Sequence, residues 1–438
     1  MRVHRRAYGL AVVAAWALLT PAAAVDLTIL EDGTAAKHVA LGNEVLVQGR
    51  YESAIKHYRQ AVLVDKQSFT ALFNLGLAYQ QLGQLAEARR WYDESLKARP
   101  GHPEALCNLG VIAFRAGEFR EAVGRFEEAA GVSQNHPEDA ADYWFNAGTA
   151  REALKEWSLA QRAYQECLVL NGLHAGGHYN LATLYLGPLT DEASSAERAL
   201  AHLRRAVELQ PDHVPALINL ALAQQRTHQG DPGATLDQAV TLGKGTDRLR
   251  ALWARATAYD QAKPPRRLAM RDDLRAILAE DPDYPQANGL FGRYHYDLAE
   301  FPAAVALLER EVASGHDDAT STIDQESHFL LAVIYTDHRP DPAKALAHAS
   351  AYYRLHPDSR KIHELRRRAL NLQPKADSHP ATTEEATAHA APTAGHGAPA
   401  AARPSSPHAK ADAPAAVNQQ IDHHAAPAPA AHDAHAGH

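Results

Sequence analysis

The chain has 438 residues, of which 52 are acidic and 44 basic, so its formal net charge is −8. Such a chain lacks the excess of Lys and Arg that binds phosphate backbones, which argues against nucleic acid as the partner. Hydrophobic residues make up 46% of the sequence, with Ala prominent. No stretch alternates apolar and polar residues as strands do, so the sequence predicts an all-α fold.

The first 24 residues have the composition of a secretory signal peptide. Basic residues at Arg2, Arg5 and Arg6 precede an apolar run over 7–19, and small residues end the segment at Ala24. This order predicts export and cleavage after Ala24, followed by a lead-in over 25–34. The apolar run is shorter than the roughly 20 residues that a membrane span needs, so we expect no span in the mature chain. The expected location is the periplasm or another exported compartment.

A short phrase of Asn followed by Leu or Ala and then Gly or Ala returns along the next two hundred residues. Its asparagines are spaced by 34, 38, 34 and 39 residues: Asn74, Asn108, Asn146, Asn180 and Asn219. Recurrence at such a period is typical of stacked structural repeats, which bury a continuous core only when several units pack in series.

The repeat has a recognisable pattern when Phe69 is counted as position 1. Positions 7, 8, 11, 15, 20, 24 and 32 then hold Leu75, Gly76, Tyr79, Gly83, Ala88, Tyr92 and Pro100. This pattern resembles the tetratricopeptide repeat (TPR). The resemblance implies a solenoid, a right-handed superhelix of antiparallel helix pairs. Pro at position 32 ends the second helix, because its ring cannot continue the hydrogen-bond ladder.

About nine units follow from this register. The regular array covers 35–226, with units at about 35–68, 69–102, 103–136, 141–174, 175–213 and 214–226 onward. The residues 137–140 are expected to separate two units, and 227–284 holds degenerate repeats whose boundaries the pattern leaves open. Two further units cover 285–358, and a polar helix over 359–373 is expected to close the stack.

The last segment, 374–438, contains no aromatic residue and no Leu, and Ala, Pro and His dominate it. Such a composition cannot bury enough apolar surface to offset its ordering entropy, so we expect disorder. Imidazole is the commonest metal-binding side chain, and the tail offers candidate ligands for a Zn, Cu or Ni ion. These are His423, His424, His432, His435 and His438.

No catalytic motif accompanies the repeats. The sequence contains no P-loop, no G-x-S-x-G, no H-E-x-x-H and no C-x-x-C, and the repeats and tail leave no room for a catalytic domain. We therefore expect a protein that is not an enzyme and needs no cofactor. Cys107 and Cys167 fall on helices that are not nearest neighbours, so both are expected to be small buried side chains without a disulfide.

The resemblance places the five asparagines at position 6, which lines the concave face of a TPR superhelix. A carboxamide donates and accepts, so a row of them can hold an extended peptide by its backbone. The row is similar to the Asn ladder in the TPR superhelix of O-GlcNAc transferases, whose catalytic domain this chain lacks. The aromatic residues expected beside it are Phe73, Phe114, Phe145 and Tyr179. The alternative is that Asn at this position is common in the repeat and bonds locally.

The sequence thus predicts a non-enzymatic scaffold of the cell envelope that binds a segment of an unidentified partner protein in the TPR groove. The competing hypothesis is a metal-binding or surface-binding accessory protein that acts through its His-rich tail. The sequence leaves the oligomeric state undetermined.

Overall fold

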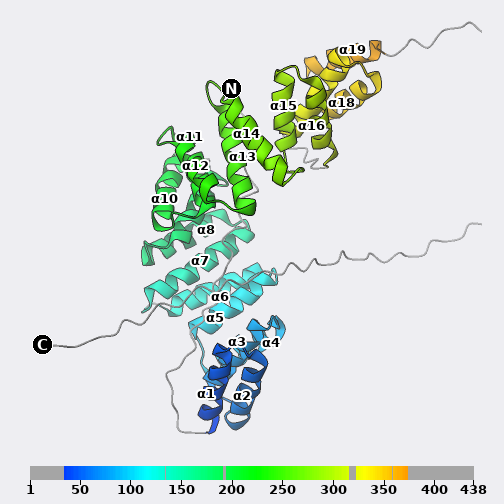
Figure 1. Cartoon of the computed structure of the whole chain (residues 1–438). Helices are drawn as coiled ribbons and strands as arrows, with labels where there is room; N and C mark the ends of the chain where they lie inside the picture. Colours follow the sequence, from blue (N-terminus) through cyan, green and yellow to red (C-terminus); the bar gives the residue numbers. More distant parts are fainter. Residues whose placement is uncertain (1–33, 134, 191–193, 315–321, 358, 373–438) are drawn as a thin grey trace, which may run out of the picture. The chain divides into compact units, whose positions relative to one another are not determined.

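The computed structural model describes residues 34–133, 135–190, 194–314, 322–357 and 359–372. This described part is built from helices and contains no β-strand, which confirms the all-α class (Figure 1). The chain divides into two units, 1–375 and 376–438, and the second lies wholly outside the description. The expected signal peptide, the lead-in up to residue 33 and the five tail histidines also lie outside it and stay predictions.

The helices follow one another in pairs. The first four pairs are α1 (Thr34–Val47) with α2 (Tyr51–Val64), α3 (Phe69–Gln81) with α4 (Leu85–Ala98), α5 (Pro103–Arg115) with α6 (Phe119–Val132), and α7 (Pro137–Ala153) with α8 (Trp157–Leu170). The next four are α9 (Ala175–Leu186) with α10 (Ser195–Leu209), α11 (Val214–Thr227) with α12 (Pro232–Leu242), α13 (Gly245–Gln261) with α14 (Arg267–Glu280), and α15 (Ala287–Asp297) with α16 (Phe301–Ala313). A ninth pair joins α17 (Thr322–Val333), which continues as the π-helical turn η1 (Ile334–His338), to α18 (Pro342–Leu355), and α19 (Arg360–Asn371) ends the described helices.

Each helix packs against the helix that follows it along the chain. The core is therefore a series of local contacts, as expected for a stack in which every unit touches only its neighbours. In the pairs from α3–α4 to α11–α12 the first helix buries more of its residues than the second: α3 buries eleven and α4 buries three. The first helices therefore supply most of the buried residues of these pairs.

Close contact within a pair depends on glycine at position 8 and an aromatic ring at position 24. A Cβ atom built on Gly76 would lie 2.6 Å from the ring of Tyr92, and one on Gly110 would lie 2.6 Å from the ring of Phe126. Both rings have no exposed surface. Only a residue without a side chain lets the two helices approach this closely, which explains why the Leu-Gly part of the repeated phrase returns with the aromatic residue.

The turn inside each of the first pairs uses a residue in the left-handed region at position 15. Gly49, Gly83 and Gly117 have φ of 73°, 73° and 78°, and a glycine adopts this conformation without strain. Lys155 takes the same place in the fourth pair with φ of 59°. The turn geometry is therefore kept where the glycine is lost.

One boundary expected from the sequence is wrong. Residues 137–140 were expected to separate two units, but α7 begins at Pro137 and runs for 17 residues, four more than α5. Proline is favoured in the first turn of a helix because its missing N–H has no partner there in any case. The four additional residues lengthen a helix and do not form a linker.

The weak part of the sequence pattern, 227–284, still folds as helices α12, α13 and α14. The last helix, α19, buries Ile362, Leu365 and Ala369. It therefore packs through one stripe, as expected for a closing helix. Cys107 and Cys167 are both buried and free, as the sequence predicts.

Candidate functional site

The five repeated asparagines lie on α3, α5, α7, α9 and α11, and we call the surface of the first helices that they mark the Asn face. Their exposed fractions are 0% for Asn74 and Asn108, 4% for Asn146, 8% for Asn180 and 5% for Asn219. The sequence predicts that these side chains line the open concave face. In the structure they are buried between successive helix pairs. Their peptide-binding role stays a prediction.

Asn74 connects the second helix pair to the first. Its Nδ2 donates a hydrogen bond of 2.8 Å to Oδ1 of Asn43 in α1, and the hydroxyl of Tyr58 in α2 donates to the same oxygen at 2.8 Å. Two side chains from different helices thus donate to one buried acceptor on a third helix. Polar groups that are buried with partners of this kind fix the register of the packing.

Asn180 and Asn146 make equivalent connections with different partners. Asn180 Nδ2 donates to the Tyr164 hydroxyl at 3.1 Å, so α9 is joined to α8. The equivalent aromatic residue before Asn146 is Phe126, which has no hydroxyl, and Asn146 Nδ2 instead donates to Cys107 Sγ at 3.8 Å. Burial raises the pKa of the Cys107 thiol to about 12, which keeps the sulfur neutral at this contact.

Two of the asparagines have buried polar atoms without a partner. Neither Nδ2 nor Oδ1 of Asn108 forms a hydrogen bond with any residue that the structure describes, and Oδ1 of Asn74 also lacks one there. A buried polar atom without a partner is unfavourable, and each such atom in a native protein needs an explanation, such as a water molecule or a ligand. The unpaired atoms lie on neighbouring first helices of the Asn face, α3 and α5.

The aromatic residues expected beside the asparagines are mostly covered by histidines. Phe73, Phe145 and Tyr179 are exposed by 1%, 8% and 2%. Each ring packs on the histidine that precedes the next first helix, with centroids 5.5 Å apart for Phe73 and His102, 4.7 Å for Phe145 and His174, and 4.9 Å for Tyr179 and His213. Phe114 differs: it is half-buried and packs edge-on against Phe119.

Two of these histidines also cap the helices that they precede. Nδ1 of His174 accepts the backbone N–H of Gly177 at 2.8 Å, and Nδ1 of His213 accepts that of Ala216 at 3.1 Å. A side-chain acceptor at this place satisfies one of the free N–H groups at a helix start. His102 and His136 occupy the same place without such a bond. The covered rings and the caps give these histidines a structural role.

Glu152, near the end of α7, is a polar residue of the Asn face that the sequence analysis did not single out. It stands at position 12 of its repeat, and its Oε1 is buried without a hydrogen-bond partner among the described residues. Burial raises the pKa of its carboxyl group to about 7, and a hydrogen bond with the Tyr164 hydroxyl opposes this increase. Position 12 of the second pair holds Gln80, which accepts a hydrogen bond from the Tyr92 hydroxyl at 2.9 Å. A polar residue thus recurs at position 12, and this recurrence in the sequence could have indicated Glu152.

Replacing Glu152 by Gln should therefore stabilise the fold above neutral pH. The folded-state pKa is about 7, against 4.5 for an exposed carboxyl. The unfolded chain therefore loses its proton first, and stability falls as the pH rises from 4.5 to 7. With allowance for partial exposure, the Glu152→Gln variant should gain about 1–2 kcal/mol at pH 8 and close to nothing at pH 4. Urea denaturation at both pH values measures this. The exposed Glu128→Gln change is the control, and an equal gain from it would contradict the role of burial.

Metal binding by the tail is untested, because its histidines lie outside the described residues. Within the description, no three His, Cys, Asp or Glu side chains are placed to hold a metal ion. None of the described helices is long and apolar enough to cross a membrane.

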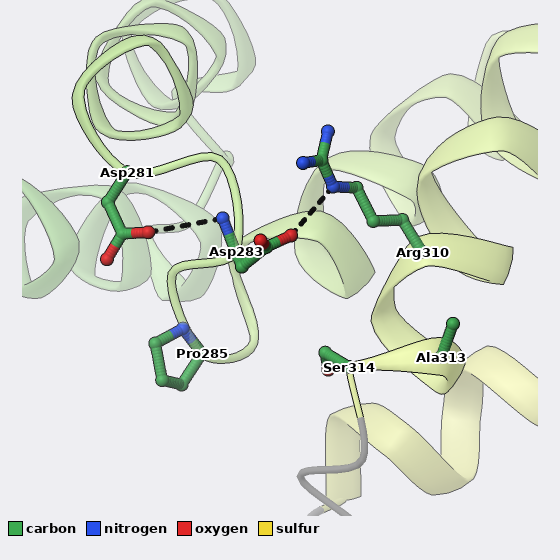
Figure 2. Close-up of a pocket in the computed structure, with 6 residues that line it drawn as sticks. All are labelled: Asp281, Asp283, Pro285, Arg310, Ala313 and Ser314. Carbon is green, nitrogen blue, oxygen red and sulfur yellow. Dashed lines mark hydrogen bonds and ion pairs between the residues drawn. The ribbon is translucent and has the colours of Figure 1, made fainter.

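A hollow of a different kind lies between the α14–α15 turn and the end of α16 (Figure 2). Arg310 Nε donates to Asp283 Oδ1 at 2.8 Å, and the backbone N–H of Asp283 donates to Asp281 Oδ1 at 3.2 Å. Arg310 and Asp283 are both more than half exposed, so their ion pair is weak and solvated. Figure 2 shows the Arg310–Asp283 and Asp283–Asp281 bonds across this hollow, and the Ser314 hydroxyl at its edge donates to the backbone of Glu311.

The fold defines a helical-hairpin solenoid in which glycine at position 8 packs under an aromatic ring at position 24. The family model of the tetratricopeptide repeat matches three stretches of the chain, 39–103, 107–168 and 290–360. The chain therefore contains tetratricopeptide repeats over these three stretches. The matched stretches leave out 169–289, which contains the irregular spacing after α9 and the degenerate units.

Known proteins resemble the chain over its repeats. A curated relative, protein O-mannosyl-transferase tmtc2 of Xenopus laevis, is 40% identical over 65 residues. These residues are 14% of this chain, which thus spans only 8% of that relative. Among solved structures, PilF of Pseudomonas aeruginosa has 20% identity and a TM-score of 0.42, covering 49% of this chain and 95% of its own. A tetratricopeptide repeat protein from Parabacteroides merdae has 18% identity and a TM-score of 0.44, covering 60% and 98%.

Proposed function

We propose that this protein is a non-enzymatic interaction scaffold that is exported to the cell envelope, where the Asn face binds an extended segment of a partner protein. The observation that supports this most directly is the unpaired carboxamide of Asn108, with the unpaired Oδ1 of Asn74 on the preceding first helix. A peptide unit offers one C=O and one N–H, which match the donor and the acceptor of one carboxamide.

The repeat architecture supports the same proposal. Stacked helix pairs present a continuous surface formed from many units, and proteins of this kind use such surfaces for binding. The sequence contains none of the catalytic motifs sought in it. The envelope location is supported by the signal-like composition of 1–24. Asn108 is buried, so the backbone of a bound peptide can reach it only when neighbouring first helices move slightly apart. A stack of repeats allows such motion because it has no single large core that would have to break.

The Asn108→Ala variant separates binding from folding. Removing this carboxamide orphans no partner, because neither of its atoms is bonded, so the free energy of unfolding should change by less than about 1 kcal/mol. Binding should fall by about tenfold, the contribution of one or two hydrogen bonds. The probe is a bead library of random dodecapeptides with acetylated N-termini and amidated C-termini, from which the full-length chain selects ligands whose affinities are then measured by calorimetry.

The control is Gln229→Ala, which removes an exposed carboxamide that lies beyond the end of α11 and outside the helices of the Asn face. This variant should keep the affinity of the wild-type chain. If Asn108→Ala also keeps it, the Asn face is not the binding surface. If the wild-type chain selects no peptide, the proposed function is wrong.

A further inference from the structure

Glu152 is an acidic side chain of the Asn face with a buried oxygen that forms neither a hydrogen bond nor an ion pair with a described residue. The buried Oε2 of Glu104 on α5 differs, because it lies 3.0 Å from His102 Nδ1. Oε1 has no hydrogen-bond partner among the described residues. The neighbouring Arg151 is directed elsewhere: its guanidinium binds Glu127 and, at 3.0 Å, Glu156. Two effects shift the pKa of Glu152: burial raises it, and the hydrogen bond with the Tyr164 hydroxyl lowers it. No described cation contributes to the shift.

The surroundings of Glu152 connect it directly to the asparagine row. The Tyr164 hydroxyl, which contacts the carboxyl group of Glu152, accepts a hydrogen bond from Asn180 Nδ2 at 3.1 Å. Thr149 Oγ1 lies 3.3 Å from the same hydroxyl and also donates to the Phe145 backbone at 3.1 Å. Asn180 Nδ2 and Thr149 Oγ1 thus already donate to other acceptors. Oε1 of Glu152 is left without a donor among the described residues.

We propose that Glu152 forms a subsite of the Asn face for a cationic side chain, Lys or Arg, of the bound partner segment. The inference rests on the proposed function, since it assigns one side chain of the peptide that the asparagines hold. Charge complementarity carries it, because a buried carboxylate without a counter-ion is costly and gains most from a cation brought by the ligand.

A neutral donor would satisfy Glu152 less well than a cation. The carboxyl group, with its pKa near 7, is partly protonated at neutral pH. A protonated carboxyl can already donate and accept with neutral groups, whereas a cation stabilises only the ionised form. Binding of a Lys or Arg side chain should therefore release a proton from Glu152, and binding of a neutral side chain should not. This release distinguishes the two kinds of ligand.

The test uses a positional-scanning library of acetylated and amidated dodecapeptides with the full-length chain. The wild-type chain should prefer Lys or Arg over Gln at one position by about tenfold to a hundredfold, as expected for a hydrogen bond with a charged group. Glu152→Gln should abolish this preference, and the exposed Glu128→Gln should keep it. Separate Lys and Arg peptides show which cation fits. Calorimetry at pH 7 in two buffers of different ionisation enthalpy should detect proton release with the wild type only.

The outcomes separate this inference from the proposed function. A preference that persists in Glu152→Gln, with no proton release in the wild type, would overturn the subsite and leave peptide binding intact. The subsite would also be overturned if Asn108→Ala lost all peptide binding while Glu152→Gln kept the cation preference. Peptide binding by the Asn face would stand in that case. Absence of any peptide binding by the wild type would overturn both. Urea denaturation at pH 8 shows whether Glu152→Gln is folded.

Discussion

Replacing Gly110 by Ala is expected to lower the free energy of unfolding by about 2–3 kcal/mol, the upper part of the range for overpacked cores. A Cβ at this position would lie 2.6, 2.8 and 3.0 Å from three ring atoms of Phe126. The ring has no exposed surface and cannot turn away. Helices α5 and α6 must separate instead, which loosens the contacts between them and with the neighbouring helices α4 and α7. Urea denaturation followed by the helical circular dichroism signal measures the loss.

Gly124→Ala is the matched control. Gly124 lies inside α6, as Gly110 lies inside α5, but a Cβ there would meet no atom within 4 Å. The change should stabilise the protein by up to about 1 kcal/mol, because Ala is a better helix former than Gly. If the two substitutions shift the urea midpoint in the same direction, close packing is not the reason for Gly110.

The Leu, Gly and aromatic positions of the repeat were predictable because each is needed by a contact inside one unit. Gly76 and Tyr92 are 16 residues apart, and the same contact returns as Gly110 with Phe126. A requirement that recurs from unit to unit can be recognised in a single sequence. The helix pairs follow from it. The aromatic ring under the glycine is kept in the first four pairs, whereas Gly292 in α15 packs on Leu308.

The error at residues 137–140 has a different origin. Counting positions shows that four residues have been added before the next Asn, but not whether they extend a helix or lie between helices. The structure assigns them to the first turn of α7, which begins with Pro137. The backbone of such residues is satisfied in either arrangement, so local sequence carries little information on the choice.

The polar chemistry of the Asn face was less predictable, because it depends on partners in neighbouring units. Asn146 bonds to Cys107 since Phe126 has no hydroxyl, and Asn108 has no partner while Tyr92 donates to Gln80. The same residue type thus has a different environment in each of these units. Spacing alone predicts where the asparagines stand, but not which of them keep free hydrogen-bonding capacity.

Acid should destabilise the protein between pH 6.5 and 4 through three partly buried histidines: His202, His213 and His348. Burial lowers the pKa of each imidazole from 6.5 to about 4. The folded chain keeps them neutral in this range, while the unfolded chain takes up protons below 6.5. Stability is therefore fully present above pH 6.5 and is lost as the pH falls towards 4.

The neutral forms are needed by specific contacts. His202 Nδ1 lies 2.9 Å from Nδ1 of His178, and His348 Nδ1 lies 3.0 Å from that of His328, so one nitrogen of each pair must accept. His213 accepts the N–H of Ala216. Nearby charges act in both directions: Asp212 and Asp247 favour protonation of His213, Glu309 favours it and Lys344 opposes it at His348, and burial is the larger effect at each histidine.

With allowance for partial exposure, each histidine should contribute about 1–2 kcal/mol, and the three together about 3–6 kcal/mol. Urea denaturation at pH 7 and pH 4.5 measures the loss in the wild type. The triple variant His202→Gln, His213→Asn and His348→Gln cannot take up these protons, and Asn keeps a capping acceptor before α11. Its loss over the same range should be smaller by about the same 3–6 kcal/mol. Carboxylates remain in both proteins, so their contribution cancels in the comparison. An equal loss in wild type and variant would show that acid acts through carboxylates alone.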